Sequence, residues 1–309
     1  MTIFQAGVPR SGNLWMYRTI QKIFEVTETP THSIATAFRD SIGWNPYIDR
    51  EQTFTHDVLS IKPEGVFWEP THQSAIEIQD IDHFIAASSH IWTHQPFCDE
   101  RQNIYHKFDK IIYILRDPRD VLISNSKYLF TDRTKSLRPR EDQSETSQKF
   151  IEEEHFKRVH GWIRHVGSYL KHAFYFKNMH FVFYERLLAD FDAEFEGLCS
   201  VLDFSLNKEQ RHKVKQAVSF QKMHQEKPEH VRKGTSGQWE STLTAKQIEN
   251  ISQVGGPFLQ LLGYGVECEL NTLPQLPSLS ELSPEEISQV IATSGKVRSR
   301  LIREQKQKE

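Results

Sequence analysis

Short apolar runs alternate along the chain with longer segments in which apolar residues recur every three or four positions. The short runs favour β-strands, and the longer segments favour helices that bury one face. The pattern predicts five strands, at residues 3–8, 65–69, 84–92, 110–116 and 180–185. Strands separated by helices build a parallel sheet with helices on both faces. We therefore predict an α/β fold of three layers, with a central and mainly parallel sheet flanked by helices.

Two long polar segments interrupt this alternation. Residues 131–149 are rich in charges and hydroxyls, and a helix is predicted after them at about 150–174. A mobile lid and a plain solvated linker are both compatible with this composition. A second irregular segment, at residues 222–239, separates helical patterns and carries two adjacent cations.

The last part of the chain has its own start signal for a helix. Ser283-Pro-Glu-Glu286 supplies an N-cap, a proline at the first helical position and a capping-box glutamate. Apolar residues follow at three- and four-residue steps, at Ile287, Val290, Ile291, Val297 and Leu301. This stripe must bury against the main domain or against a second subunit, so a homodimer is an open alternative. We expect a main domain, a proline-rich linker and a C-terminal amphipathic helix, at residues 1–270, 271–282 and 283–309.

Composition and charge narrow the class of protein. The chain has 309 residues, of which 38% are apolar and 26% charged, which is typical of a globular protein. The net charge of −3 argues against a nucleic-acid partner. Cys98, Cys199 and Cys268 do not suggest disulfides or a metal knuckle, and they suit a reducing cytoplasm. Since no leader and no apolar run near ~20 residues is found, we expect neither export nor a membrane partner.

Gly7-Val-Pro-Arg-Ser-Gly12 follows the first predicted strand and leads into a helix. Backbone N–H groups at a helix start bind anions, and glycine lets the backbone turn sharply and approach the ligand. The glycine spacing matches the phosphate loop of NTPases, but Asn13 and Leu14 stand where that loop has Lys and Ser or Thr. No hydroxyl is therefore placed to hold magnesium, and Arg10 supplies the cation. We predict a metal-free transfer of an anionic group.

Three later strands also end in candidate site residues. They are followed by Thr93-His94-Gln-Pro96, Arg116-Asp-Pro-Arg-Asp120 and Tyr184-Glu-Arg186. Ligands of open parallel sheets bind beyond the carboxyl ends of the strands. Asp117 and Pro118 predict a helix start that places Ser124 about two turns along. An arginine and a hydroxyl suit a phosphate monoester, and the alternative is that Arg116 only pairs with Asp117 or Asp120 as scaffold.

Taken in order, these segments resemble the cytosolic-type sulfotransferases that use 3′-phosphoadenosine 5′-phosphosulfate (PAPS). Residues 8–15 are similar to the family's 5′-phosphosulfate loop, 116–124 to its 3′-phosphate motif and 231–239 to its Arg-Lys-Gly signature. Weaker matches are Thr93-His94-Gln-Pro96, Phe183-Tyr-Glu185 and Ser219-Phe-Gln-Lys-Met223. Together the matches extend from residue 3 to about residue 250.

The resemblance implies a P-loop NTPase-like sulfotransferase fold and an enzyme that moves the sulfuryl group of PAPS to a small molecule. PAPS would leave as adenosine 3′,5′-bisphosphate (PAP), without a metal. His94 would be the general base, and Arg10 would stabilise the leaving phosphate. The other nucleotide-binding residues implied by the resemblance are Ser11, Gly12, Asn13, Leu14, Trp15, Arg116, Ser124, Tyr184, Phe220, Arg232, Lys233 and Gly234.

The chain departs from the family pattern at several positions. Arg10 replaces a lysine, and arginine cannot donate a proton at ordinary pH, so it would act through charge and hydrogen bonding. Trp92 replaces another lysine and adds an apolar surface on the acceptor side. Val218 removes a hydroxyl near the adenine, and Glu240 replaces the lysine that begins the family's dimerisation signature.

The sequence defines the acceptor less narrowly than the nucleotide. The candidate residues of the acceptor-binding site are mostly aromatic, and they are Trp44, Tyr47, Phe54, His56, Trp68, Glu69, Trp92 and Phe97. Such a set suits a phenol or an alcohol, although aromatic residues more often serve to pack the core. Glu69 and Asp57 would instead suit an amine or guanidine of specialised metabolism.

Two other functions are compatible with a phosphate cradle. A P-loop nucleotide kinase or NTPase would share the fold but needs magnesium ligands beside the cradle. A non-catalytic adenine-nucleotide-binding protein would bind the same ligand without transfer. Magnesium-dependent ATP turnover would favour the kinase.

Overall fold

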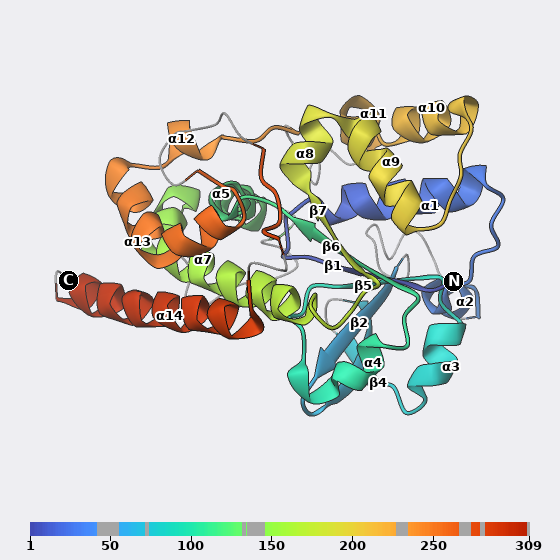
Figure 1. The fold of residues 1–309 in the computed structure, drawn as a ribbon, viewed down its shortest axis with the longest axis horizontal. Helices are drawn as coiled ribbons and strands as arrows, with labels where there is room; N and C mark the ends of the chain where they lie inside the picture. The colour runs from blue at the N-terminus through green and yellow to red at the C-terminus, as the bar shows by residue number, and fades with distance from the viewer. Residues whose placement is uncertain are drawn as a thin grey trace.

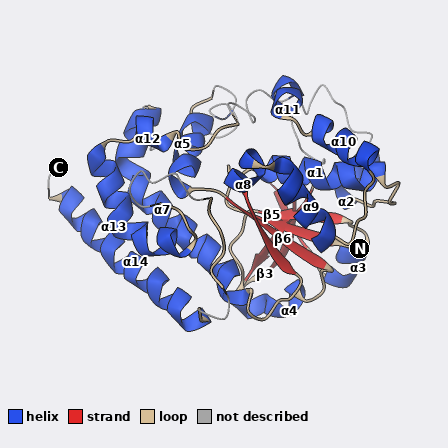
Figure 2. Cartoon of the chain, turned by 45° about the horizontal axis from the view of Figure 1, so that its top comes forward, coloured by secondary structure: helices blue, strands red, loops and turns tan. Residues whose placement is uncertain are grey.

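The computed structural model describes residues 1–41, 56–71, 74–131, 134, 146–226, 234–265, 273–278 and 282–307. Within these ranges seven strands form one sheet, in the order β4-β3-β2-β5-β1-β6-β7. Helices cover both faces of this sheet (Figures 1 and 2). The predicted α/β class, with three layers around a mainly parallel sheet, is confirmed.

One side of the sheet is parallel. It consists of β5 (His90–Thr93), β1 (Ile3–Ala6), β6 (Lys110–Leu115) and β7 (Met179–Phe183). Ala6 of β1 aligns with Thr93 of β5 on one side and with Tyr113 of β6 on the other. This register brings the segments that follow β1, β5 and β6 together at the carboxyl edge of the sheet.

The other edge of the sheet is antiparallel, which the sequence did not predict. β2 (Asp57–Lys62) runs parallel to β5, and then β3 (Gly65–Thr71) and β4 (Ser74–Glu77) turn back in antiparallel pairing. The apolar pattern missed β2 because Asp57 and Ser60 occupy buried positions within it. It missed β4 because that strand is short and its described side chains are exposed.

The predicted strand at residues 84–92 is wrong in its first half. Residues Ile81–Ala86 form the helix α3, and only His90–Thr93 form a strand. The Asp80 side chain accepts a hydrogen bond from the backbone N–H of His83 at 2.9 Å and caps this helix. Because Phe84 and Ile85 are both buried, a helix of six residues gives the same short apolar run as a strand.

Alternate residues of the central strands face two hydrophobic cores. Phe4 and Tyr113 belong to a core that includes α7 (Ser147–His172) and α13 (Ala245–Leu261). Ile3 and Ile112 face a second core with α1 (Asn13–Val26), α9 (Phe191–Val201) and α10 (Lys208–Ala217). This two-residue period follows from the strand geometry. The other described helices are α2 (Ile34–Ser41), the 3-10 turn Asp99–Arg101, α4 (Gln102–Tyr105), α5 (Pro118–Leu129), α8 (Tyr184–Ala189), α11 (Phe220–Glu226) and α12 (Trp239–Thr242).

The C-terminal helix α14 (Pro284–Lys306) packs along α7 and α13 (Figure 1). Ile287 and Leu301 of its apolar stripe are buried in the first core. The Nδ1 of His160 on α7 lies 2.9 Å from the Oγ of Ser294 on α14. The stripe therefore buries within its own chain. A homodimer remains a prediction.

Every helix in the described ranges is too short or too polar to cross a membrane.

Candidate functional site

The carboxyl edge of the sheet opens into a cavity of about 1040 Å3. We call one part of it the cradle side, which is formed by the loop at residues 7–12, Arg116, Tyr184, Phe220 and Gly234. We call the other part the histidine side, which is formed by His56, Glu69, Trp92, His94 and the residues of α7 and α14 that line the cavity.

The loop between β1 and α1 is held in a tight turn. Arg10 and Gly12 both have positive φ, 75° and 96°. A Cβ at Gly7 would lie 2.5 Å from the Asn13 Oδ1, and one at Gly12 would lie 2.7 Å from a ring carbon of Tyr184, so neither position accepts a side chain. No acidic residue stands in the first turn of α1. The positive end of this helix therefore favours an anion in the loop.

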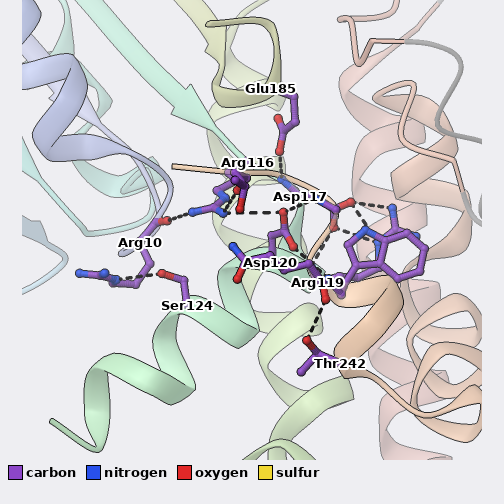
Figure 3. A network of polar contacts seen from close by, with 12 residues as sticks. Arg10, Arg116, Asp117, Arg119, Asp120, Ser124, Glu185 and Thr242 are labelled. Atoms are coloured by element: carbon purple, nitrogen blue, oxygen red, sulfur yellow. Dashed lines mark hydrogen bonds and ion pairs between the residues drawn. The ribbon is translucent and has the colours of Figure 1, made fainter. Parts of the chain in front are cut away.

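Arg10, Arg116 and Ser124 lie together on the cradle side (Figure 3). The Nε of Arg10 donates to the Oγ of Ser124 at 3.2 Å, and the Arg10 guanidinium lies 4.5 Å from the ring centroid of Tyr128. Arg116 donates to the carbonyl of Arg10 at 3.3 Å, and its guanidinium lies 4.3 Å from the ring centroid of Tyr184. The structure thus joins two cations that are far apart in the sequence.

Arg116 also has a scaffold role. One of its terminal nitrogens lies 3.7 Å from the Asp120 carboxylate, whose oxygens accept the backbone N–H groups of Gly237 and Trp239 at 2.8 and 3.2 Å. Arg116 is buried, and its Nε has no hydrogen-bond partner among the described residues. A buried guanidinium with an unused donor suits an anionic ligand.

Asp117 and Pro118 begin α5 as predicted. The Asp117 carboxylate accepts the backbone N–H of Arg119 at 2.8 Å and pairs with the Arg119 guanidinium at 2.6 Å. That guanidinium lies 3.7 Å from the ring centroid of Trp239. This buried pair, drawn in Figure 3, fixes the helix start that carries Ser124.

Glu185 supports the same corner from α8. Its carboxylate accepts the backbone N–H of Asp117 at 2.9 Å and the hydroxyl of Tyr264 at 3.1 Å. Burial raises the pKa of Glu185 to about 7. Glu185 is thus a buried group whose charge changes near neutral pH.

Two further polar atoms of the cradle side are buried without a hydrogen-bond partner among the described residues. They are the Oγ of Ser11 and the Nε1 of Trp15. The Trp15 ring meets the Tyr184 ring edge-on, with 5.6 Å between centroids. Buried polar atoms without a partner are uncommon in folded proteins, and these two fit a polar ligand held between the loop and an aromatic wall.

His94 follows β5 directly and stands beside the cradle. Because Ala6 aligns with Thr93, the next residues Gly7 and His94 are neighbours, and the His94 Nδ1 lies 2.8 Å from the Gly7 carbonyl. A carbonyl only accepts, so Nδ1 carries the proton and the lone pair is on Nε2. The ring is therefore set in the tautomer that can take a proton from a substrate.

A buried histidine of α7 positions the His94 backbone. The Nε2 of His165 donates to the His94 carbonyl at 3.1 Å, and the Tyr113 hydroxyl donates to the Nδ1 of His165 at 2.7 Å. Burial lowers the pKa of His165 to about 4, so this ring is neutral at neutral pH. Tyr169 also donates to the Gln95 carbonyl, at 3.2 Å. The helix α7 thereby fixes the turn that carries His94.

Aromatic rings pack beside His94. The Trp92 ring lies 5.2 Å from His94 and 5.2 Å from His56, centroid to centroid, and Tyr17 lies 4.2 Å from His56. His90 stacks on Tyr17 at 4.5 Å, and burial, with a contribution from His56, lowers its pKa to about 3. Beside these rings the cavity is lined by the apolar Val58 and Pro70 and by the polar Ser60, Glu69 and Gln95.

A family model of the sulfotransferase domain matches residues 2–263. The chain belongs to the sulfotransferase family. It is 27% identical over 180 residues to cytosolic sulfotransferase 1 of Danio rerio, which is 53% of this chain and 58% of that protein. It is 25% identical over 182 residues to sulfotransferase 2A1 of Homo sapiens, which is 52% of this chain and 60% of that protein. The matched region thus spans less than two thirds of the length of these relatives.

Solved sulfotransferase structures share the fold. Mouse sulfotransferase SULT7A1 complexed with PAP superimposes with a TM-score of 0.56 at 21% identity, covering 84% of each chain. Retinol dehydratase in a complex with retinol and PAP gives a TM-score of 0.54 at 17% identity, covering 88% of this chain and 83% of that one. At these identities the likeness shows the fold.

Most of the predicted site residues line the cavity. They are Arg10, Gly12, Asn13, Leu14, Trp15, His56, Glu69, Trp92, His94, Arg116, Ser124, Tyr184, Phe220 and Gly234. Ser11 is fully buried in the loop. Trp44, Tyr47, Phe54, Arg232 and Lys233 lie outside the described residues.

Three acceptor-side predictions are wrong. Trp68 is buried in the core, 5.3 Å from the Phe38 ring, and Phe97 stacks on Tyr105 and His172. Asp57 is buried and accepts the backbone N–H groups of Ile34 and Ala35 at 3.2 and 2.7 Å, so it holds the start of α2. None of the three lines the described cavity. The chemistry of these side chains suits a pocket, but Trp68 and Phe97 pack in the core and Asp57 caps α2.

The sequence missed part of the histidine side. Glu154, Lys157, Arg158 and Gly161 of α7 line the cavity, and so does Arg298 of α14. Charged residues on an amphipathic helix are typical of a solvated face. Their place in the cavity follows from how α7 and α14 pack in the fold, which a helical pattern alone does not give.

Proposed function

We propose that this sulfotransferase moves the sulfuryl group of PAPS to a hydroxyl or a nitrogen of a small molecule. The observation that carries the proposal is the 2.8 Å contact between the His94 Nδ1 and the Gly7 carbonyl, which joins a general base to an anion cradle. The buried Arg116 and the orphaned Ser11 and Trp15 atoms support a nucleotide on the cradle side.

His94 acts as the base in this reaction. The acceptor oxygen or nitrogen attacks sulfur while its proton moves to the Nε2 of His94. The bond between sulfur and the 5′-phosphate oxygen breaks, and its electron pair stays on that phosphate, which leaves as PAP. Negative charge grows on the leaving oxygen, so a cation there lowers the barrier.

The two arginines of the cradle side have separate roles. Arg10 lies in the loop that would hold the 5′ end of PAPS, where its charge stabilises the leaving phosphate. Arg116 and Ser124 would bind the 3′-phosphate, and Trp15, Tyr184 and Phe220 would flank the adenine. The contact between Arg10 and Ser124 at 3.2 Å joins the side chains that we assign to the two phosphates.

We expect His94→Ala to abolish transfer and to leave PAP affinity nearly unchanged, because the base contacts the acceptor and not the nucleotide. A screen for transfer of radiolabelled sulfate to phenols, alcohols, amines and guanidines supplies the acceptor for the assay. Loss of the general base should lower kcat by about 100-fold or more. Calorimetry with PAP measures the nucleotide site separately.

His212→Ala is the matched control, because His212 is an exposed residue of α10. This variant should keep both transfer and PAP affinity. Full transfer in His94→Ala would remove the mechanism, and wild-type protein that does not bind PAP would remove the proposed donor.

A further inference from the structure

The charges that line the cavity are unevenly distributed. Among its described lining residues the carboxylates are Glu69 and Glu154, whereas the cations are Arg10, Arg116, Lys157, Arg158 and Arg298. Arg10 and Arg116 belong to the cradle side. The other three, which we call the basic wall, stand on the histidine side.

The positive charges of the basic wall are only partly balanced by nearby carboxylates. Glu154 is shared by two of its members, at 3.0 Å from Lys157 and 3.4 Å from Arg158. Arg298 forms no ion pair with any residue that the structure describes. Glu69 belongs to β3 and accepts a hydrogen bond from the Ser60 hydroxyl. Among the described residues, the histidine side is therefore lined by three cations and two carboxylates, and one of these carboxylates already accepts from Ser60.

The helix α7 connects the basic wall to the base. His165, which holds the His94 carbonyl, is followed toward the helix N-terminus by Gly161 and Arg158 at steps of four and three residues. Such residues lie on one face of a helix. At 1.5 Å per residue, Arg158 stands about 10 Å along the axis from His165. A small molecule can span that distance.

Arg298 reaches the same place from a different helix. The contact between Ser294 and His160 at 2.9 Å sets the register of α14 on α7. Arg298 is one turn beyond Ser294, and Lys157 is one turn before His160, so the antiparallel helices bring these two cations to the same level. Burial lowers the pKa of His160, and the nearby charges of Arg298 and Arg164 lower it further. Figure 1 shows α14 running alongside α7.

We infer that the acceptor of this sulfotransferase carries an anionic group, such as a carboxylate or a phosphate, which the basic wall binds. The inference rests on the proposed function and deepens it. Arg298 lies outside residues 2–263, to which the family model matches. The C-terminal helix therefore supplies an acceptor contact that the matched domain does not contain. Hydrogen bonds between charged groups are strong enough to select such an acceptor.

The test compares matched pairs of hydroxyl compounds that differ only in a carboxylate and its primary amide. Calorimetry measures the binding of both members to the full chain, with and without PAP. We expect the carboxylate to bind at least about 10-fold more tightly than the amide. Arg298→Gln should reduce this preference by about 10-fold, and Arg298→Glu should abolish it.

Lys296→Gln is the control, because Lys296 is an exposed cation of the same helix. It should keep the preference for the carboxylate. Equal affinity for the two members, tighter binding of the amide, or no binding of either would overturn the inference. PAP affinity is read in the same experiment, so failure of the nucleotide site is distinguished from failure of the basic wall.

Discussion

The buried Nε of Arg116 and the Oγ of Ser11 illustrate how single residues define this site. Each lacks a hydrogen-bond partner among the described residues. Leaving such an atom unsatisfied costs about 1–3 kcal/mol. Both atoms stand at the carboxyl edge of the sheet, where a bound phosphate would satisfy them. A nucleotide should therefore stabilise the fold as well as enter the reaction.

Glu185 makes the stability of the protein depend on pH. Its pKa is about 7 in the folded chain and 4.5 as the ordinary value. Between these values the folded state holds a proton that the unfolded chain has released. The free energy of unfolding therefore falls as pH rises through this window, and the contribution is lost above about pH 7.

Glu185→Gln should remove this dependence, since its amide keeps an oxygen to accept the Asp117 N–H. Urea unfolding at about pH 5 and about pH 8 should show the wild type losing roughly 2–3 kcal/mol relative to the variant. Glu240→Gln, at an exposed position, is the control and should follow the wild type. Parallel pH curves for wild type and Glu185→Gln would contradict the assignment.

Among single residues, the sequence predicted those that directly follow a strand. His94, Arg116 and the loop around Arg10 come directly after strands, and parallel strands bring such segments together. Trp68 and Phe97 were placed wrongly because aromatic residues fill cores and pockets alike. Arg298 was not predicted, since its role depends on how two helices far apart in the chain meet.

At the scale of elements, helices and strands with clear start and stop signals were predicted best. α7 and α14 agree with their predicted ranges within a few residues, because capping residues and a long periodic stripe define them. α3 was predicted as a strand, since six residues are too few to show a helical period. The short antiparallel edge strand β4 was missed for a similar reason.

The docking of α14 gives a prediction about stability. Ile287 is fully buried in the first core, so Ile287→Ala should lower the free energy of unfolding by about 2–4 kcal/mol. Ile76→Ala is the matched control, because Ile76 is 46% exposed on β4. Urea denaturation measures both. Equal small effects of the two substitutions would mean that α14 does not pack on the domain as described.

At the scale of the whole molecule, the proposed nucleotide and acceptor sites share one cavity. The cradle side is built by β1, β6 and the helices α1, α5 and α8, whereas the histidine side adds α7 and α14. A substitution on α7 should therefore affect the acceptor without changing the nucleotide. The sequence predicted which residues gather on the cradle side, because they are near neighbours of strand ends, and predicted fewer of the residues that line the histidine side.

Gly161 allows this separation to be tested. It lies within α7 and lines the cavity, and a Cβ there would meet nothing within 4 Å. Gly161→Leu should fill the histidine side and raise the KM for the acceptor by on the order of 10-fold. PAP affinity should not change, and thermal stability should not fall, because leucine favours a helix by roughly 0.5–1 kcal/mol over glycine.

Gly197→Leu is the control for helix propensity. Gly197 is an exposed residue of α9 that also has open space around its Cα. It should share the gain in stability and leave the acceptor KM unaltered. A large loss of PAP affinity in Gly161→Leu would show that the two sides of the cavity are not separate.

The hydrogen bonds of His165 have a consequence for the shape of a pH–activity curve. This ring uses both nitrogens, and its pKa of about 4 keeps it uncharged across mildly acidic conditions. The turn it supports thus keeps one geometry while the medium becomes acidic. A fall in turnover at acidic pH would then mean that His94 itself has taken up a proton. It would not mean that the turn carrying His94 has lost its geometry.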